Sequence, residues 1–221
     1  DCNWEQEEHC VAINADFSLL ADTFPKQVEA SARWKVNTAG EISLSVDVHI
    51  GDRVAFLPRF GIRFSMGKAF DRVEYFGPGP SDSYIDRKNA SYMGVFRSDV
   101  ASQMTDYIRP QECGNHFGTE WAVVCDAEKR GLLFWRREGF DFQALPYTAW
   151  ELDAAGHNYS LPVSDKTVVH LDYRQSGVGS NSCGPRLDEK YQLREKDFTM
   201  ELKLRPFDGK ADSPWEKSAG E

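Results

Sequence analysis

The stretch VEASARWKVNTAGEISLSVDVHI, from Val28 to Ile50, decides the fold of this chain. Apolar and polar residues alternate from Val28 to Val36, and the same alternation returns from Ile42 to Ile50. Successive side chains of a β-strand point to opposite faces, so each run predicts a strand with one buried and one wet side. The segment between them, Asn37 to Gly40, has the composition of a turn. We therefore expect a β-hairpin.

The same alternation recurs outside this hairpin. Clear runs lie at Phe60–Met66 and Phe198–Leu204. Further strand candidates are Val11–Leu20, Phe70–Phe76, Trp121–Cys125, Gly131–Arg136 and Thr167–Tyr173. A short helix is expected only at Tyr147–Ala154. About nine strands and almost no helix predict an all-β domain, built as a large antiparallel β-sandwich.

Length and composition set limits on the class of protein. The chain has 221 residues and a mass of 25.1 kDa, which fits one large domain. Its 41% of hydrophobic and 13% of aromatic residues exclude intrinsic disorder. The net charge of −9 disfavours binding to nucleic acid. No apolar run approaches the ~20 residues of a membrane helix, so we expect no membrane partner either.

We expect a single sandwich domain over residues 13–207. Residues 1–12 are interpreted as a linker or the end of a preceding segment, and residues 208–221 as a loose tail. No signal peptide is visible, and the first residue is Asp1 instead of Met, so we expect a processed product or a piece of a larger protein.

The cysteines bear on the compartment and on metal binding. The chain has five at irregular spacings, namely Cys2, Cys10, Cys113, Cys125 and Cys183. The absence of a Cys-x-x-Cys pair argues against a zinc site, and no metal is predicted. We expect free thiols, with a pair between the first two as the alternative. Free thiols favour a reducing compartment, hence the cytoplasm over the periplasm.

Three segments are too rich in Gly, Pro and polar residues to be plain strands. In the first, Gly77–Arg87, the side chains of Asp86 and Arg87 either clamp the loop to the sheet or bind sugar hydroxyls. The third, Leu171–Pro185, predicts a tight turn beside a ligand or a neighbouring domain. It lacks the spacing of a phosphate-binding loop.

The second segment, Tyr107–Trp121, is the densest in hydrogen-bonding side chains. It holds four candidates for substrate binding: Arg109, Glu112, Asn115 and His116. Such side chains suit a polar pocket, although a polar network that stabilises a long connection is the alternative.

The sequence assigns no catalytic residue and no cofactor. The five histidines show no His-x-x-x-His or His-Glu-x-x-His spacing, and no Gly-x-Ser-x-Gly nucleophile motif is present. Carboxylate pairs for glycoside hydrolysis are defined by their separation in space, which the sequence does not contain.

Five motifs occur in an order that resembles a known family. They are LPRFG (Leu57–Gly61), YFGPGPSDSYIDR (Tyr75–Arg87), YIRPQECGN (Tyr107–Asn115), FDFQALPYTAWELDAAGH (Phe140–His157) and LDYRQSGVGSNSCGP (Leu171–Pro185). From about Ile13 to Phe207, the chain resembles the C-terminal domain of the large multidomain β-galactosidases of glycoside hydrolase family 2. The resemblance implies a sandwich of the galactose-mutarotase type.

The same resemblance implies which partners the chain has. The catalytic glutamates of that family lie on a preceding TIM-barrel domain, to which nothing here corresponds. The expected partners are that barrel, the other upstream domains and, through the full-length enzyme, a galactoside substrate. The chain alone is expected not to hydrolyse glycosides.

The resemblance also adds a fifth site residue. In some members, the last domain contributes a tryptophan to the mouth of the sugar pocket. Local alignment puts Arg137 or Glu138 at that position, two or three residues from Trp135. Trp135 therefore joins the candidates for substrate binding.

Two other readings stay open. The first is a free-standing aldose 1-epimerase or carbohydrate-binding sandwich; an epimerase would use a histidine and a carboxylate, either His116 with Glu112 or His157 with Asp172. The second is a scaffold domain that packs on its neighbours and touches no sugar.

Overall fold

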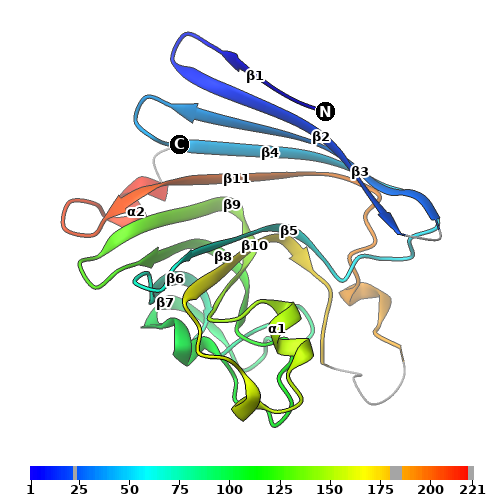
Figure 1. Ribbon diagram of the computed structural model, residues 1–221, viewed down its shortest axis with the longest axis vertical. Coiled ribbons are helices and arrows are strands. Elements are labelled where there is room, and N and C mark those ends of the chain that lie inside the picture. Colours follow the sequence, from blue (N-terminus) through cyan, green and yellow to red (C-terminus); the bar gives the residue numbers. More distant parts are fainter. Residues whose placement is uncertain (22–23, 180–185, 219–221) are drawn as a thin grey trace.

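The chain folds mainly into antiparallel strands, as shown by a computed structural model that describes residues 1–21, 24–179 and 186–218 (Figure 1). The strands are β1 (Cys2–Gln6), β2 (Cys10–Ala21), β3 (Phe24–Asn37), β4 (Ile42–Ile50), β5 (Arg59–Gly67), β6 (Arg72–Gly79), β7 (Tyr92–Asp99), β8 (Asn115–Cys125), β9 (Arg130–Leu145), β10 (Lys166–Gln175) and β11 (Asp197–Asp208). The helices are α1 (Ala149–Ala154), α2 (Pro214–Ser218) and the 3-10 turns η1 (Val100–Gln103), η2 (Asn158–Ser160) and η3 (Glu189–Tyr191).

The strands pair in the order β1-β2-β3-β4-β11-β9-β8-β6-β7, and β10 joins β5 to β9. The predicted hairpin is β3–β4, in which Val28 pairs with Ile50 and Val36 with Ile42. In Figure 1 the sheet that carries β1–β4 and β11 lies across a second layer that contains β5, β8 and β10. The prediction of an all-β antiparallel sandwich is confirmed.

The hydrophobic core lies between these layers. Alternate residues of β3 and β4 enter it: Val28, Ala30, Ala32, Leu44, Val46, Val48 and Ile50 are all buried. The residues between them, such as Ser31 and Asp47, pair on the opposite face of the sheet. The period-two pattern of the sequence thus marks which face is covered.

Strand β9 belongs to both layers. Trp135, in its first half, pairs with Lys203 of β11, whereas Asp141 in its second half pairs with Asp172 of β10. The change takes place at an irregularity shared with β8, where Gly118 and Gly139 both have a positive φ, of 67° and 77°. A Cβ on Gly139 would lie 3.3 Å from Gly118, so the two strands bend where both residues lack a side chain.

The two ends of the chain are more ordered than their composition indicates. Instead of a linker, residues 1–12 contain β1 and the start of β2, paired in register from Cys2 with Ala15 to Gln6 with Val11. In the expected tail, the Trp215 ring of α2 packs against Phe76, with ring centroids 4.5 Å apart. The same ring also contacts Trp121, at 5.6 Å, so two aromatic contacts anchor a segment that is otherwise polar.

The thiols of Cys2, Cys10, Cys113 and Cys125 are free, as expected, while Cys183 lies outside the described residues. None of the helices within the described ranges is long and apolar enough to span a membrane.

Candidate functional site

A network of charged and polar side chains lies at one end of the sandwich, around Arg59 at the start of β5. Its guanidinium donates from Nε to Asp172 Oδ2 at 2.9 Å, pairs with the same carboxylate through Nη2, and donates from Nη1 to Glu112 Oε2 at 3.2 Å. The Asp172 side chain is only 3% exposed, against 23% for Arg59 and 27% for Glu112. One arginine therefore pairs with both a buried and a partly exposed carboxylate.

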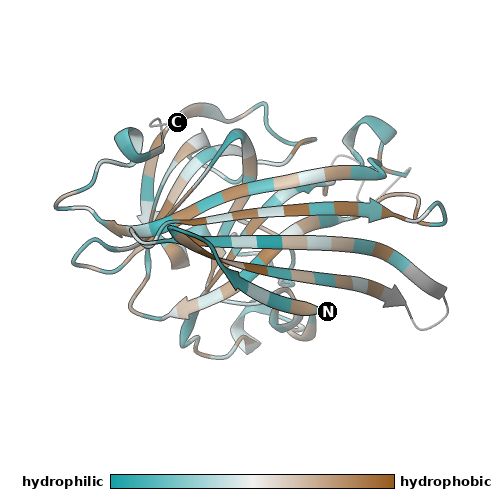
Figure 2. Cartoon of the chain, turned by 90° about the horizontal axis from the view of Figure 1, so that it is seen from above, coloured by the Kyte–Doolittle hydropathy of each residue, from teal (hydrophilic) through white to brown (hydrophobic). Residues whose placement is uncertain are grey.

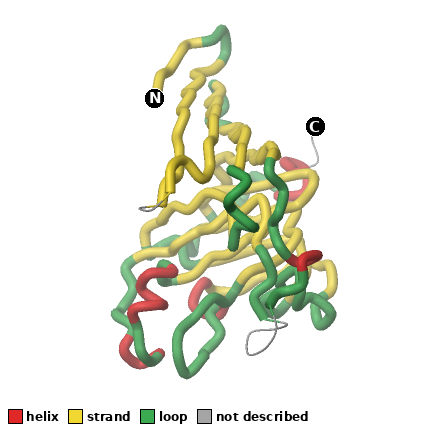
Figure 3. Tube along the Cα trace, turned by 90° about the vertical axis from the view of Figure 1, so that its right-hand side faces the viewer, coloured by secondary structure: helices red, strands yellow, loops and turns green. Residues whose placement is uncertain are grey.

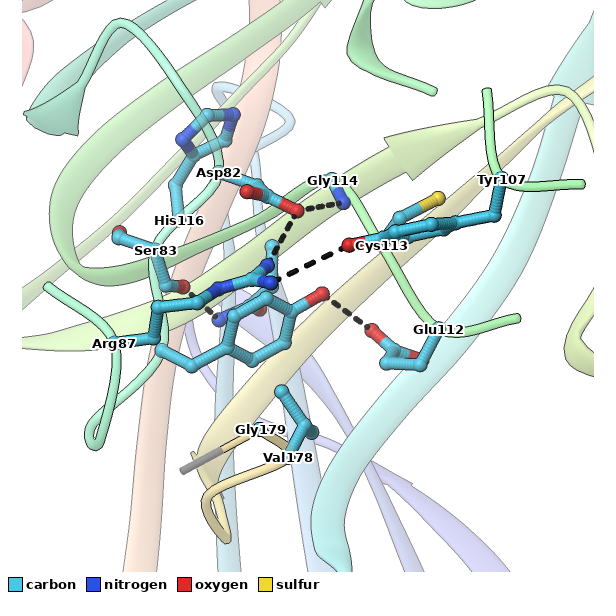
Figure 4. Close-up of polar contacts among 12 residues, drawn as sticks. Asp82, Ser83, Arg87, Tyr107, Glu112, Cys113, Gly114, His116, Val178 and Gly179 are labelled. Carbon is cyan, nitrogen blue, oxygen red and sulfur yellow. Dashed lines mark hydrogen bonds and ion pairs between the residues drawn. The ribbon is translucent and has the colours of Figure 1, made fainter. Parts of the chain in front are cut away.

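Glu112 is fixed by neutral donors as well. Gln143 Nε2 donates to Glu112 Oε1 at 2.5 Å and to the carbonyl of Cys113 at 2.6 Å. The buried Tyr84 hydroxyl donates to Glu112 Oε1 at 3.3 Å (Figure 4). Burial, followed by the nearby Glu112 charge, raises the pKa of the Tyr84 phenol, which keeps it a hydrogen-bond donor.

Two buried carboxyl groups face each other on adjacent strands. Asp141 of β9 pairs with Asp172 of β10, and both side chains are inaccessible to bulk water. Burial raises the pKa of Asp141 to about 7, opposed by the backbone N–H of Gln175, and raises that of Asp172 to about 6, opposed by Arg59. Asp141 therefore titrates near neutral pH, whereas Asp172 is mostly ionised there, beside Arg59.

The stability of the fold should depend on pH through Asp141. Because the pKa of Asp141 is about 7 in the folded state, the folded chain binds a proton between about pH 4 and pH 7 that the unfolded chain has released. The stabilisation from this proton is complete below the unfolded pKa, near 4, and is lost as the pH rises through 7. We expect the free energy of unfolding to fall between pH 5 and pH 8 by at most about 1.4 kcal/mol per pH unit from this group. Urea unfolding across this range should show that Asp141→Asn flattens the slope, whereas Asp153→Asn, on the exposed side of α1, does not.

The Gly77–Arg87 loop is tied to the segment that precedes β8. Asp82 Oδ2 accepts from the Gly114 N–H at 3.2 Å and from Arg87 Nη2 at 2.9 Å (Figure 4). Arg87 Nη1 also donates to the Tyr107 hydroxyl at 3.3 Å, and its guanidinium lies over the Tyr84 ring. These groups bind protein partners, which favours the clamp over direct sugar binding.

Asp86 ties the same loop to the end of β10. Its carboxylate accepts from the backbone N–H groups of Val178 and Gly179, at 3.2 and 3.0 Å. A Cβ on Gly177 would lie 2.5 Å from this carboxylate, so the turn approaches Asp86 as closely as glycine allows. The Asp86 carboxylate thus links the motif GPGPSDSYIDR to the motif LDYRQSGVGSNSCGP by hydrogen bonds.

A surface groove of about 680 Å³ adjoins the network. Arg109 and Glu112 line it together with the start of α1, around Ala149 and Leu152. Glu112, whose side chain is 27% exposed, is the member of the network that borders this groove. Across the described residues, no group of three His, Cys, Asp or Glu side chains is arranged to hold a metal ion.

Comparison with known proteins identifies the family. A family model described as "Beta galactosidase small chain" matches residues 1–204. The chain belongs to this family. The resemblance to β-galactosidases carried by the five motifs is confirmed.

Several bacterial β-galactosidases are similar in sequence to most of this chain. The β-galactosidase of Actinobacillus pleuropneumoniae is 33% identical over 204 residues, covering 92% of this chain and 20% of the relative. That of Staphylococcus xylosus is 32% identical over 201 residues, covering 90% and 20%. The chain thus spans about a fifth of the length of these relatives.

Among solved structures, a galactose 1-epimerase from Lactobacillus acidophilus is similar over 95% of this chain and 66% of that chain, with a TM-score of 0.44 and 9% identity. The overlap is partial, and the sandwich assignment stands on the strand pairing of the small-chain domain itself.

The structure separates the five predicted site residues of this small-chain domain. Glu112 and Arg109 share the groove. Asn115 is buried and donates from Nδ2 to the Ser83 carbonyl at 2.9 Å. His116 is buried, contacts Gln103 through Nε2, and stacks on Tyr75 with centroids 4.0 Å apart. Burial lowers the pKa of His116 to about 4, so this ring is neutral and structural.

Trp135 lies in a different part of the molecule. It is 7% exposed, pairs with Trp121 across β8 and β9, and packs in a second apolar cluster with Leu133 and Phe207. The groove beside Glu112 does not include it. The five candidates therefore do not form one site.

Of this network, the sequence pointed to Glu112 as a candidate site residue and to Asp172 as an epimerase carboxylate, but it did not point to Arg59 or Gln143. Arg59, Tyr84, Gln143 and Asp172 lie in four of the five motifs that carry the family resemblance. The available signal was that these motifs contain charged and amide residues at strand positions, where a buried polar group needs a partner.

Proposed function

We propose that this chain forms the sandwich part of a β-galactosidase, which hydrolyses terminal β-galactosides with glutamates on a separate barrel domain. In this proposal the sandwich supports the barrel and presents the groove beside Glu112 to the sugar or its aglycone. It is not catalytic alone. The family match and the size of the relatives, about five times that of this chain, support this assignment.

The observation that carries the proposal is that Glu112 is fixed by hydrogen bonds and still partly exposed to solvent. This carboxylate is held in place by Arg59, Tyr84 and Gln143, yet its side chain is 27% exposed and borders the groove. A fixed carboxylate with free acceptor capacity is suited to bind sugar hydroxyl groups, which donate hydrogen bonds.

The geometry gives less support to the epimerase. His116 is buried and neutral and binds other partners than Glu112, from which it lies apart in Figure 4. Asp172, the alternative carboxylate, is closed off from solvent and paired with Arg59. A general acid or base must reach the proton that it transfers.

The test replaces Glu112 in the assembled β-galactosidase that contains this sandwich. We expect Glu112→Gln to raise KM for a galactoside about tenfold with a small change in kcat, because a hydrogen bond to a charged group is lost in ground and transition state alike. Kinetics over a range of substrate concentrations separates the two constants.

The matched control is Glu120→Gln, which changes an exposed glutamate on β8 outside this groove. Unchanged kinetics for Glu112→Gln with a lowered unfolding midpoint would instead establish a scaffold role. Turnover of galactosides by this chain alone would contradict the proposal directly.

A further inference from the structure

The strands β1 and β2 expose large apolar side chains along one face. Figures 1 and 3 show this hairpin at the free edge of the broad sheet, beyond the layered part of the molecule. The face consists of Trp4, Val11, Ile13, Phe17 and Leu19, with exposed fractions of 71, 38, 37, 42 and 51%. We call these five residues the hairpin face.

The hairpin face continues the side of the sheet that forms the core. Directly paired residues of neighbouring strands lie on the same face of a sheet. Phe17 pairs with Ala30 and Leu19 with Val28, and both partners are core residues. The apolar surface therefore runs from the core outward onto β2 and, through the pair of Trp4 with Ile13, onto β1.

The opposite face of the same strands is built for water. Arg33 of β3 binds Glu5 at 3.1 Å and Glu7 at 2.6 Å, and Lys35 binds Glu7 at 3.0 Å. Figure 2 shows the alternation of hydrophobic and hydrophilic residues along these strands. One face of the hairpin thus carries charged side chains that form ion pairs, while the other face is as apolar as a protein core.

An apolar sheet face that continues a core is costly to leave in water. In addition, β1 is an edge strand, whose outer backbone groups are able to pair with a further strand. Both features fit an extended, apolar segment as the missing cover.

We propose that the hairpin face is covered by a segment of the rest of the β-galactosidase, which completes the opposing layer of the sandwich. The proposal rests on the function proposed above, and the length of the relatives supplies the occupant: this chain accounts for only 20% of the Actinobacillus pleuropneumoniae and Staphylococcus xylosus proteins. A second copy of this chain is the competing occupant.

The alternation of β2 provides a matched pair of variants. Phe17 faces the proposed segment, whereas Ser18, the next residue, points to the opposite face. In the assembled β-galactosidase we expect Phe17→Asn to raise the unfolded fraction at a fixed denaturant concentration by roughly tenfold or more relative to Ser18→Asn, because a buried phenylalanine contributes that much to an equilibrium. Equal effects of the two variants would overturn the proposal.

Oxidative footprinting of the unmodified assembled enzyme tests the same surface without a variant. Trp4 and Phe17 should react several-fold more slowly than their exposure in this chain implies. Full reactivity at both residues would overturn the proposal. Protection that disappears when the enzyme is diluted until it is monomeric would also overturn the proposal, because a second copy would then be what covers the hairpin face. Neither the stability comparison nor the footprinting depends on enzymatic activity. The galactosidase assignment is therefore tested separately, by measuring the activity of the same preparation.

Discussion

Replacing Arg59 by methionine should lower the free energy of unfolding by about 3–5 kcal/mol, the cost of leaving a buried charge without its partner. The Asp172 carboxylate is 3% exposed and has Arg59 as its ion-pair partner at 2.9 Å. Glu112 would lose the same neighbour but retains Tyr84 and Gln143. Urea unfolding followed by circular dichroism measures the loss.

The control for this prediction removes both charges. In the double variant with Arg59→Met and Asp172→Leu, no unpaired buried charge remains, so most of the lost stability should return. A single variant that costs less than about 1 kcal/mol would show that the pair is not held in the buried geometry described here.

Replacing Gly61 by alanine should also be severe, with a loss of about 3 kcal/mol or more. A Cβ at Gly61 would lie 2.4 Å from the Asp172 Cα, 2.4 Å from the Leu171 carbonyl oxygen and 2.3 Å from the Asp172 carboxylate. Two of these atoms are backbone, so β5 and β10 have to separate, and overpacking of this kind costs more than a side-chain adjustment. The displacement would also disturb the contact of Asp172 with Arg59.

Strand β5 contains its own control. At Gly67, the other end of the same strand, an added Cβ would have no atom within 4 Å, so Gly67→Ala should leave the unfolding midpoint almost unchanged. Similar midpoints for the two alanine variants would contradict the close approach of β5 and β10 at Gly61.

The period-two pattern predicted the strands that have one buried and one wet face, because such a pattern depends only on neighbouring residues. It missed β7, an edge strand in which Tyr92, Met93 and Val95 are exposed although apolar, so that polar and apolar residues do not alternate although Phe96 packs against the core. It also ended β9 at Arg136, because the polar stretch Arg136–Glu138 and Gly139 interrupt the pattern, although apolar and polar residues alternate again from Phe140 to Ala144.

The site was less predictable than the fold, for a geometric reason. The Arg59 network joins residues that are 113 and 53 positions apart in the chain, and the register of β5, β9 and β10 brings them together. A single sequence contains no information on register between distant strands. Glu112 was found because its own segment is dense in polar residues, whereas Arg59 stands in an ordinary strand.

The continuity of β9 has a consequence for how the whole enzyme is assembled. Its 16 residues run from the sheet that leads to the hairpin face, through the bend at Gly139, to the layer that holds the Glu112 groove, a span of at most about 50 Å. Because both regions are attached to this one strand, β9 sets the distance between the hairpin face and the Glu112 groove. In the proposed β-galactosidase, a neighbouring domain that contacts both regions would therefore have to match the separation that β9, with its bend at Gly139, sets between them.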